Sequence, residues 1–150
     1  MRRAHRRRFR AAARSAAKYV VLDSSGLSGL IGRSERARAQ LRWVVEHGGS
    51  VLVPSPVLAE TITGQSGRDS EINRILGVLQ RGRNAIVAPD EATARLAGRL
   101  RFQAGTDDGI DALVAAAAAL AGGPSVLLTS DADDLLRLLA GYATVAVRIV

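Results

Sequence analysis

Acidic residues recur in this sequence at or near the ends of short apolar runs, where several carboxylates could act together. Asp23 follows the run Y-V-V-L, and Asp131 follows V-L-L-T-S. Glu60 lies within V-L-A-E-T, and Asp111 opens D-A-L-V-A-A-A-A. Carboxylates gathered at one site repel one another unless a divalent cation offsets their charge. Oxygen ligands without His or Cys favour Mg²⁺ or Mn²⁺ over zinc or copper.

Taken singly, each acid also has a simpler interpretation as a solvated charge or a helix cap. Asp107, Asp108 and Asp133 fit that interpretation, because acids are favourable at helix N-termini. Asp23 fits it less well, since an aspartate that ends a four-residue apolar run has little evident structural reason to be there. The metal hypothesis therefore depends on several acids meeting at one edge of the fold.

Other catalytic chemistries find little support. The chain has no cysteine, which excludes disulfides, thiol catalysis and cysteine-ligated zinc. Its two histidines are His5 and His47, and no G-x-S-x-G elbow is present for a serine hydrolase. The glycines after Asp23 are spaced G-x-x-G-x-x-G, which is not the dinucleotide fingerprint. A phosphotransfer domain that uses Asp23 as nucleophile usually has a second Asp two residues on, where this chain has Ser25.

The elements that must position the acids alternate between short strands and helices. The strands are expected as unbroken apolar runs, which is typical of a parallel sheet covered on both faces. We predict a three-layer α/β/α fold with a central, mainly parallel sheet of four to five strands. Because ligands bind at the carboxyl ends of such strands, Asp23 and Asp131 should lie at one edge. Strands are predicted at residues 19–22, 50–53, 85–88, 126–129 and 144–149, and helices at 24–30, 34–46, 55–63, 69–80, 89–103, 106–121 and 131–140.

The basic character of the chain belongs to its first residues. The formal net charge is +7, and residues 1–18 hold eight of the 21 basic residues and no acid. Residues 19–150 therefore hold 13 bases against 14 acids. We expect a single domain over 19–150, preceded by a flexible Arg-rich arm that attracts phosphates in a salt-dependent way. No apolar run is long enough for a membrane span, and the Arg-rich arm lacks the apolar stretch of a secretory signal, so a cytoplasmic location is the default expectation.

Four segments of the sequence, taken in their order along the chain, resemble the PIN-domain ribonucleases. They are V-L-D-S-S-G-L, V-L-A-E, D-A-L-V-A-A-A-A and L-L-T-S-D-A-D-D-L. The resemblance covers about residues 19–150 and is greatest to the VapC-type toxins of bacterial VapBC toxin–antitoxin pairs. The Arg-rich leader and the long stretch between Glu60 and Asp111 depart from the compact toxins. The resemblance implies that Asp23, Glu60, Asp111 and Asp131 are the catalytic, metal-binding acids, with Asp108, Thr129, Ser130 and Asp134 as possible helpers around them.

The same resemblance implies a Mg²⁺-dependent endoribonuclease, in which Mn²⁺ could substitute. A metal-activated water would hydrolyse RNA and leave 5′-phosphate and 3′-hydroxyl ends. A cognate antitoxin and a homodimer are the implied partners. A PIN nuclease in RNA processing, one acting on DNA, and a non-catalytic nucleic-acid-binding module remain open as alternatives. Candidate bases for the RNA backbone are Arg33, Arg36, Arg38, Arg68, Arg81 and Arg83.

Overall fold

A computed structural model of the protein describes residues 17–81, 83 and 85–150. In this part of the chain, strands and helices alternate almost throughout. The strands are β1 (Tyr19–Leu22), β2 (Ser50–Pro54), β3 (Ile86–Val87), β4 (Ser125–Thr129) and β5 (Val145–Ile149). The helices are α2 (Ser24–Ile31), α3 (Glu35–Glu46), α4 (Val57–Thr61), α5 (Ser66–Leu79), α6 (Glu91–Ala104), α7 (Gly109–Ala119) and α8 (Asp133–Leu138).

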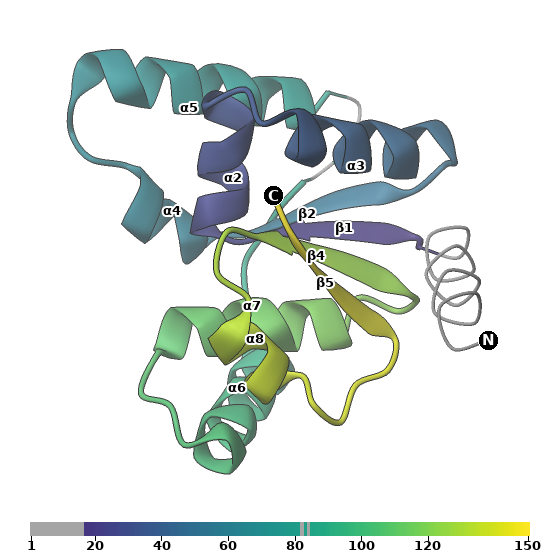
Figure 1. The fold of residues 1–150 in the computed structure, drawn as a ribbon. Helices are drawn as coiled ribbons and strands as arrows, with labels where there is room; N and C mark the ends of the chain where they lie inside the picture. Colours follow the sequence, from purple (N-terminus) through teal and green to yellow (C-terminus); the bar gives the residue numbers. More distant parts are fainter. Residues whose placement is uncertain (1–16, 82, 84) are drawn as a thin grey trace.

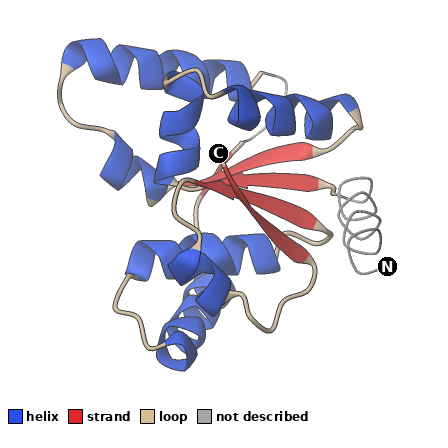
Figure 2. Ribbon diagram, in the orientation of Figure 1, coloured by secondary structure: helices blue, strands red, loops and turns tan. Residues whose placement is uncertain are grey.

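The five strands form one parallel sheet in the order β3-β2-β1-β4-β5. Helices α2, α3 and α5 cover one face, and α6, α7 and α8 cover the other (Figures 1 and 2). The predicted three-layer α/β/α fold is confirmed. The apolar runs explain this result, because a strand that is buried on both faces needs apolar side chains at every position. All five residues of β4 are buried.

The core is built from aliphatic side chains, in keeping with an aromatic content of only 3%. Leu22, Leu127 and Leu128 on the two central strands are fully buried, and burying each such side chain contributes about 1.5–3 kcal/mol. Helix α7 packs onto the same strands and buries three of its consecutive small residues, Val114 to Ala116. Such short side chains let the helix backbone approach the sheet closely.

A glycine permits the tightest packing beside β1. A Cβ atom on Gly26 would lie 2.3 Å from the carbonyl oxygen of Leu128 and 3.3 Å from the Asp23 carboxylate. The first distance is shorter than any normal contact, so no larger residue fits without moving α2 away from β4. Gly26 therefore fixes the start of α2 against the end of β4, where the predicted acids lie.

Several predicted boundaries need correction. Asp23 caps α2, and Asp108 caps α7, so that the helix predicted from residue 106 begins at Gly109. In each case the observed cap lies at an extended residue whose carboxylate reaches the backbone N–H three residues on, and this geometry defines an N-cap. The third strand is reduced to two residues.

The predicted Arg-rich arm lies almost entirely outside the described residues. The last two residues of its range are described and join the domain: Ala17 is buried, and the Lys18 N–H donates to the Pro124 carbonyl at 2.7 Å. Among the described helices, none is both long and apolar enough to cross a membrane.

Candidate active site

The strand order creates a crevice at the carboxyl ends of β1 and β4. Strand β2 pairs with one side of β1, and β4, which comes later in the chain, pairs with its other side. The chain connections that leave β1 and β4 therefore run in opposite directions along the sheet. In parallel α/β sheets this switch point is the usual place of a ligand site. Asp23 follows β1 directly, and the pairing of Leu22 with Leu128 places it beside Thr129.

Asp23 is buried, with 6% of its surface exposed. Its Oδ1 accepts the Gly26 N–H at 2.6 Å and the Ser25 hydroxyl at 2.9 Å. The expectation that this aspartate has little structural reason to be there is therefore wrong, since it caps α2. Both bonds use the same oxygen, and no described group bonds Oδ2, which leaves Oδ2 available to a ligand.

Ser25 connects the two central strands. Besides its bond to Asp23, its hydroxyl lies 3.2 Å from the Thr129 hydroxyl and accepts the Ser130 N–H at 2.8 Å. The sequence interpretation did not identify this role of Ser25. A hydroxyl two residues after a strand-ending Asp is the only signal that could have pointed to it.

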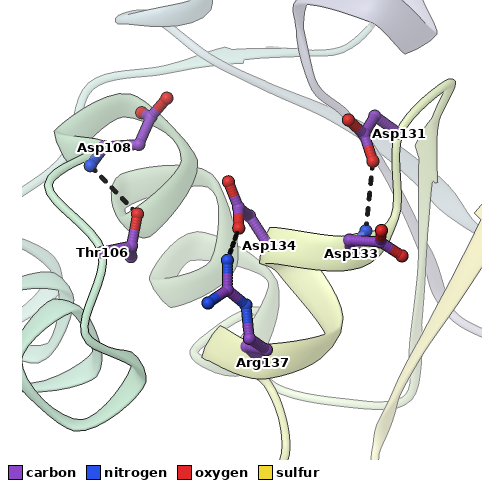
Figure 3. Close-up of polar contacts among 6 residues, drawn as sticks. All are labelled: Thr106, Asp108, Asp131, Asp133, Asp134 and Arg137. Carbon is purple, nitrogen blue, oxygen red and sulfur yellow. Dashed lines mark hydrogen bonds and ion pairs between the residues drawn. The ribbon is translucent and has the colours of Figure 1, made fainter.

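Asp131 is held by the turn between β4 and α8. Its N–H donates to the Thr129 hydroxyl oxygen at 3.1 Å, and that hydroxyl donates to the Asp131 carbonyl at 2.8 Å. The exposed Asp131 carboxylate accepts the Asp133 N–H at 3.2 Å (Figure 3). The Asp131 backbone is therefore linked to Asp23 through the neighbouring Thr129 and Ser25 hydroxyls.

Asp111 lies at the centre of the acids. It sits in the first turn of α7, where its N–H donates to the Asp108 carboxylate at 2.9 Å. Partial burial raises the pKa of Asp111 from 3.8 to about 6, with further contributions from the negative charges of Asp108, Asp23, Glu60 and Asp134. Acidic residues on or next to four helices, α2, α4, α7 and α8, therefore place their negative charges near the Asp111 carboxyl group.

We call Asp23, Glu60, Asp108, Asp111 and Asp134 the acidic cluster. Glu60, predicted as a ligand, is exposed, and Asp134 was predicted as a possible helper. The charges of both contribute to the raised pKa of Asp111. Asp134 is also paired with Arg137 on α8, and Figure 3 shows it between Asp108 and Asp131 in that view. The charge of Asp131 is not among those that raise the Asp111 pKa.

The family model described as "PIN domain" matches residues 20–140, which is most of the chain and includes all the acids above. The chain belongs to the PIN-domain family. PIN domains are nucleases, and they generally use divalent metal ions. No match was found among curated protein sequences.

Solved structures of similar fold agree with this assignment of a PIN domain. VapBC2 from Rickettsia felis, bound to a DNA fragment from its promoter, aligns with a TM-score of 0.66 at 17% identity, covering 88% of this chain and 98% of that one. DNA-bound VapBC from Salmonella typhimurium aligns with a TM-score of 0.63 at 20% identity, covering 89% of this chain and 98% of that one. FitAcB from Neisseria gonorrhoeae aligns with a TM-score of 0.62 at 19% identity, covering 85% of this chain and 95% of that one. At such identities the likeness shows a shared fold.

The acidic cluster of this PIN domain fits a divalent cation in its chemistry. Its ligands are carboxylate oxygens, and the negative charges of its other members contribute, after burial, to the raised pKa of Asp111. Within residues 17–81, 83 and 85–150, however, no three acidic or histidine side chains stand close enough to share one ion. Coordination would thus require side chains to turn inward, and the exposed Glu60 and Asp108 have the freedom to do so.

A cleft of about 600 Å³ opens beside the cluster, between α4, α6 and α7. Glu60 and Asp108 line it together with Arg101 and several small or aliphatic residues of α6 and α7. Arg101 lies 3.9 Å from the exposed Asp107 carboxylate. The PIN domain therefore places the Arg101 guanidinium in the cleft beside its acids, a second feature that the sequence interpretation did not identify.

Proposed function

We propose that this protein is a Mg²⁺-dependent endoribonuclease and the toxin of a toxin–antitoxin pair. The observation that carries the proposal is the half-buried Asp111 carboxyl group, on which four other carboxylates act at the switch point of the sheet. Several carboxylates can stay close together when a bound cation offsets their negative charge in the active protein. The PIN family supplies the reaction class, hydrolysis of a phosphodiester.

Asp23, Glu60, Asp111 and Asp131 would hold the ion, with Asp108 and Asp134 close by. When bound, the ion supplies an activated water and stabilises charge on the attacking and leaving oxygens; Mn²⁺ could replace Mg²⁺. Asp23 contributes its Oδ2, because Oδ1 is occupied by the Gly26 N–H and the Ser25 hydroxyl. Ser25 and Thr129 orient Asp23 and the backbone around Asp131 through their hydroxyl contacts.

The cleft beside Glu60 and Asp108 is the proposed path of the RNA. Arg101 can meet a backbone phosphate there, since a guanidinium donates well to phosphate oxygens. A water nucleophile leaves a 5′-phosphate and a 3′-hydroxyl. We further propose a cognate antitoxin, a homodimer and a cytoplasmic location. Antitoxin binding is supported by the VapBC and FitAB complexes of similar fold.

Cleavage of total cellular RNA tests the reaction. The purified, antitoxin-free protein is incubated with Mg²⁺ or Mn²⁺, with EDTA, and as Asp111→Asn. Asp107→Asn is the matched control, because that neighbouring side chain is fully exposed. We expect discrete cuts with 5′-phosphate ends that EDTA abolishes. Asp111→Asn should lose more than about 100-fold in rate, because even outer partners of metal ligands are worth about 10–100-fold.

The outcomes separate the alternatives. Equal cutting by Asp111→Asn and the parent would remove the acidic cluster as the active site. Cutting of DNA in preference to RNA of the same sequence would reassign the substrate. If neither protein cuts and RNA binding is saturable and salt-dependent, the protein is a binding module.

A further inference from the structure

Phe102 is the only exposed aromatic residue in the described part of the chain, with 89% of its surface open to solvent. The other described aromatic residues, Tyr19, Trp43 and Tyr142, are partly buried. Phe102 lies near the end of α6, and it is not among the described residues that pack on the core. Packing within this chain therefore does not explain a phenylalanine at this position.

Arg101, the residue before Phe102, directs its guanidinium group toward the start of α7. Its Nη2 atom lies 3.9 Å from the Asp107 carboxylate. Its Nη1 atom would lie 3.9 Å from a Cβ atom on Gly109, the first residue of α7. Arg101 also lines the cleft of about 600 Å³ together with Glu60. A phosphate bound by Arg101 would therefore lie beside the acidic cluster.

Open space lies next to Phe102 on α6, at Gly98. Gly98 lines the same cleft and lies four residues before Phe102, so the two residues share a face of the helix. Because helical side chains lean toward the N-terminus of their helix, the Phe102 ring leans over the turn that contains Gly98. A Cβ atom on Gly98 would meet no described side chain, and no backbone of another element, within 4 Å. The edge of the cleft therefore has room for a flat group against the ring.

We propose that Phe102 and Arg101 form a nucleotide subsite for single-stranded RNA, in which the ring stacks on a base and the guanidinium group binds an adjoining phosphate. The subsite rests on the proposed ribonuclease function and adds to it how the substrate is held. A nucleotide carries a flat π-face and an anionic phosphate, and these two consecutive residues offer the matching groups. A base that stacks on Phe102 must be unpaired and splayed out. The subsite therefore favours single-stranded RNA over a duplex.

A second copy of the chain fits the surface around Phe102 less well. The longer side chains exposed near Phe102 on α6 are polar: Arg95, Arg99 and Gln103. An interface between copies buries about 800 Å² per partner around an apolar centre. One ring among polar side chains does not supply such a centre, whereas a stacked base requires only one ring.

Fluorescence anisotropy with two probes tests the subsite. One probe is a short, labelled single-stranded RNA of randomised sequence, and the other is a base-free ribose-phosphate polymer of the same length. All proteins carry Asp111→Asn, which keeps the RNA uncut, and Mg²⁺ is present. Phe102→Ala should weaken RNA binding about tenfold and leave polymer binding unchanged, because it removes one stacked base. Arg101→Gln should weaken the binding of both probes about tenfold, because it removes a phosphate contact.

Matched variants separate stacking from other effects. Phe102→Trp should bind RNA tightly and Phe102→Leu should not, because only tryptophan keeps an aromatic face. Leu120→Ala removes an exposed apolar side chain at the far end of α7, and Arg99→Gln removes an exposed arginine of α6, so neither should change binding. Gly98→Leu should weaken RNA binding, because it places a side chain against the ring. Circular dichroism spectra confirm that each variant is folded.

The subsite is supported if Phe102→Ala loses RNA binding but not polymer binding, and Phe102→Trp retains both. It is overturned if Phe102→Ala or Gly98→Leu binds RNA like the Asp111→Asn protein, or if that protein binds no RNA. Equal binding by Phe102→Leu and Phe102→Trp would also overturn it. If sedimentation shows that Phe102→Ala converts a dimer to a monomer, the ring belongs to an interface between copies, and the subsite is overturned.

Cleavage assays on proteins that retain Asp111 keep the subsite separate from the proposed function. No cleavage by the parent, together with RNA binding that depends on Phe102, would refute the nuclease and leave the subsite. Cleavage by the parent that Phe102→Ala matches in both KM and kcat would refute the subsite and leave the nuclease. If both proposals hold, Phe102→Ala should raise KM about tenfold with little change in kcat, because the ring lies outside the acidic cluster.

Discussion

Asp111 provides a direct test of the electrostatic argument, because its charge should cost stability when no metal is bound. The pKa of Asp111 is raised from 3.8 to about 6, chiefly by burial and then by its acidic neighbours. Such an increase corresponds to about 3 kcal/mol in a dry interior. Asp111 is only half-buried, and solvent screens its neighbours, so we expect about 1 kcal/mol. Asp111→Asn should therefore be more stable than the parent by about 1 kcal/mol at pH 7.5 in EDTA.

The pH dependence follows from the same pKa. Between pH 4 and pH 6 the folded protein binds the Asp111 proton more tightly than the unfolded chain does, so the free energy of unfolding falls as the pH rises. The advantage of Asp111→Asn should be absent near pH 4, grow up to about pH 6 and stay constant above it. Mg²⁺ should stabilise the parent and leave the variant unchanged.

Urea unfolding followed by circular dichroism measures the effect. Asp107→Asn, whose side chain is fully exposed, is the control and should stay within about 0.5 kcal/mol of the parent. If Asp111→Asn were less stable than the parent at pH 7.5 without metal, the view of the acidic cluster as a repulsive, cation-ready site would be refuted.

The remaining predictions concern the support of the cluster and the assembly. Gly26→Ala should cost about 1–3 kcal/mol in urea unfolding, because its Cβ would overlap the Leu128 carbonyl; Gly77→Ala on α5, with open space around it, should be neutral or stabilising by up to about 1 kcal/mol. Ser25→Ala should lower stability by about 1 kcal/mol through its lost hydrogen bonds and should also slow RNA cleavage, whereas unchanged cleavage would limit Ser25 to a structural role. A thermal shift on adding Mg²⁺ should occur in the parent and be lost in Asp23→Asn, which keeps a good N-cap residue. Sedimentation should show a dimer if the proposed homodimer forms, and a monomer at all concentrations would exclude it.

The sequence alone was sufficient to predict the layers of the fold and the edge where the acids lie. Strands buried on both faces must be apolar throughout, so V-V-L and V-L-L-T could be recognised without knowing their neighbours. Parallel strands end at one edge, which brings Asp23 and Asp131 to the same side. Both inferences depend only on local pattern and on a general property of parallel sheets.

Tertiary structure alone decided which acids act on one another. Ser25 contacts Ser130 across 105 positions of the chain. The charges of Asp23, Glu60, Asp108 and Asp134 act on Asp111 because α2, α4, α7 and α8 bring them near it. The cleft beside Arg101 likewise forms only where α4, α6 and α7 pack together. Such contacts depend on the rotation and the spacing of packed helices, which Gly26 sets for α2 by allowing it to approach β4. The spacing of apolar and polar residues along the chain does not determine those distances, so they are known only from the folded structure.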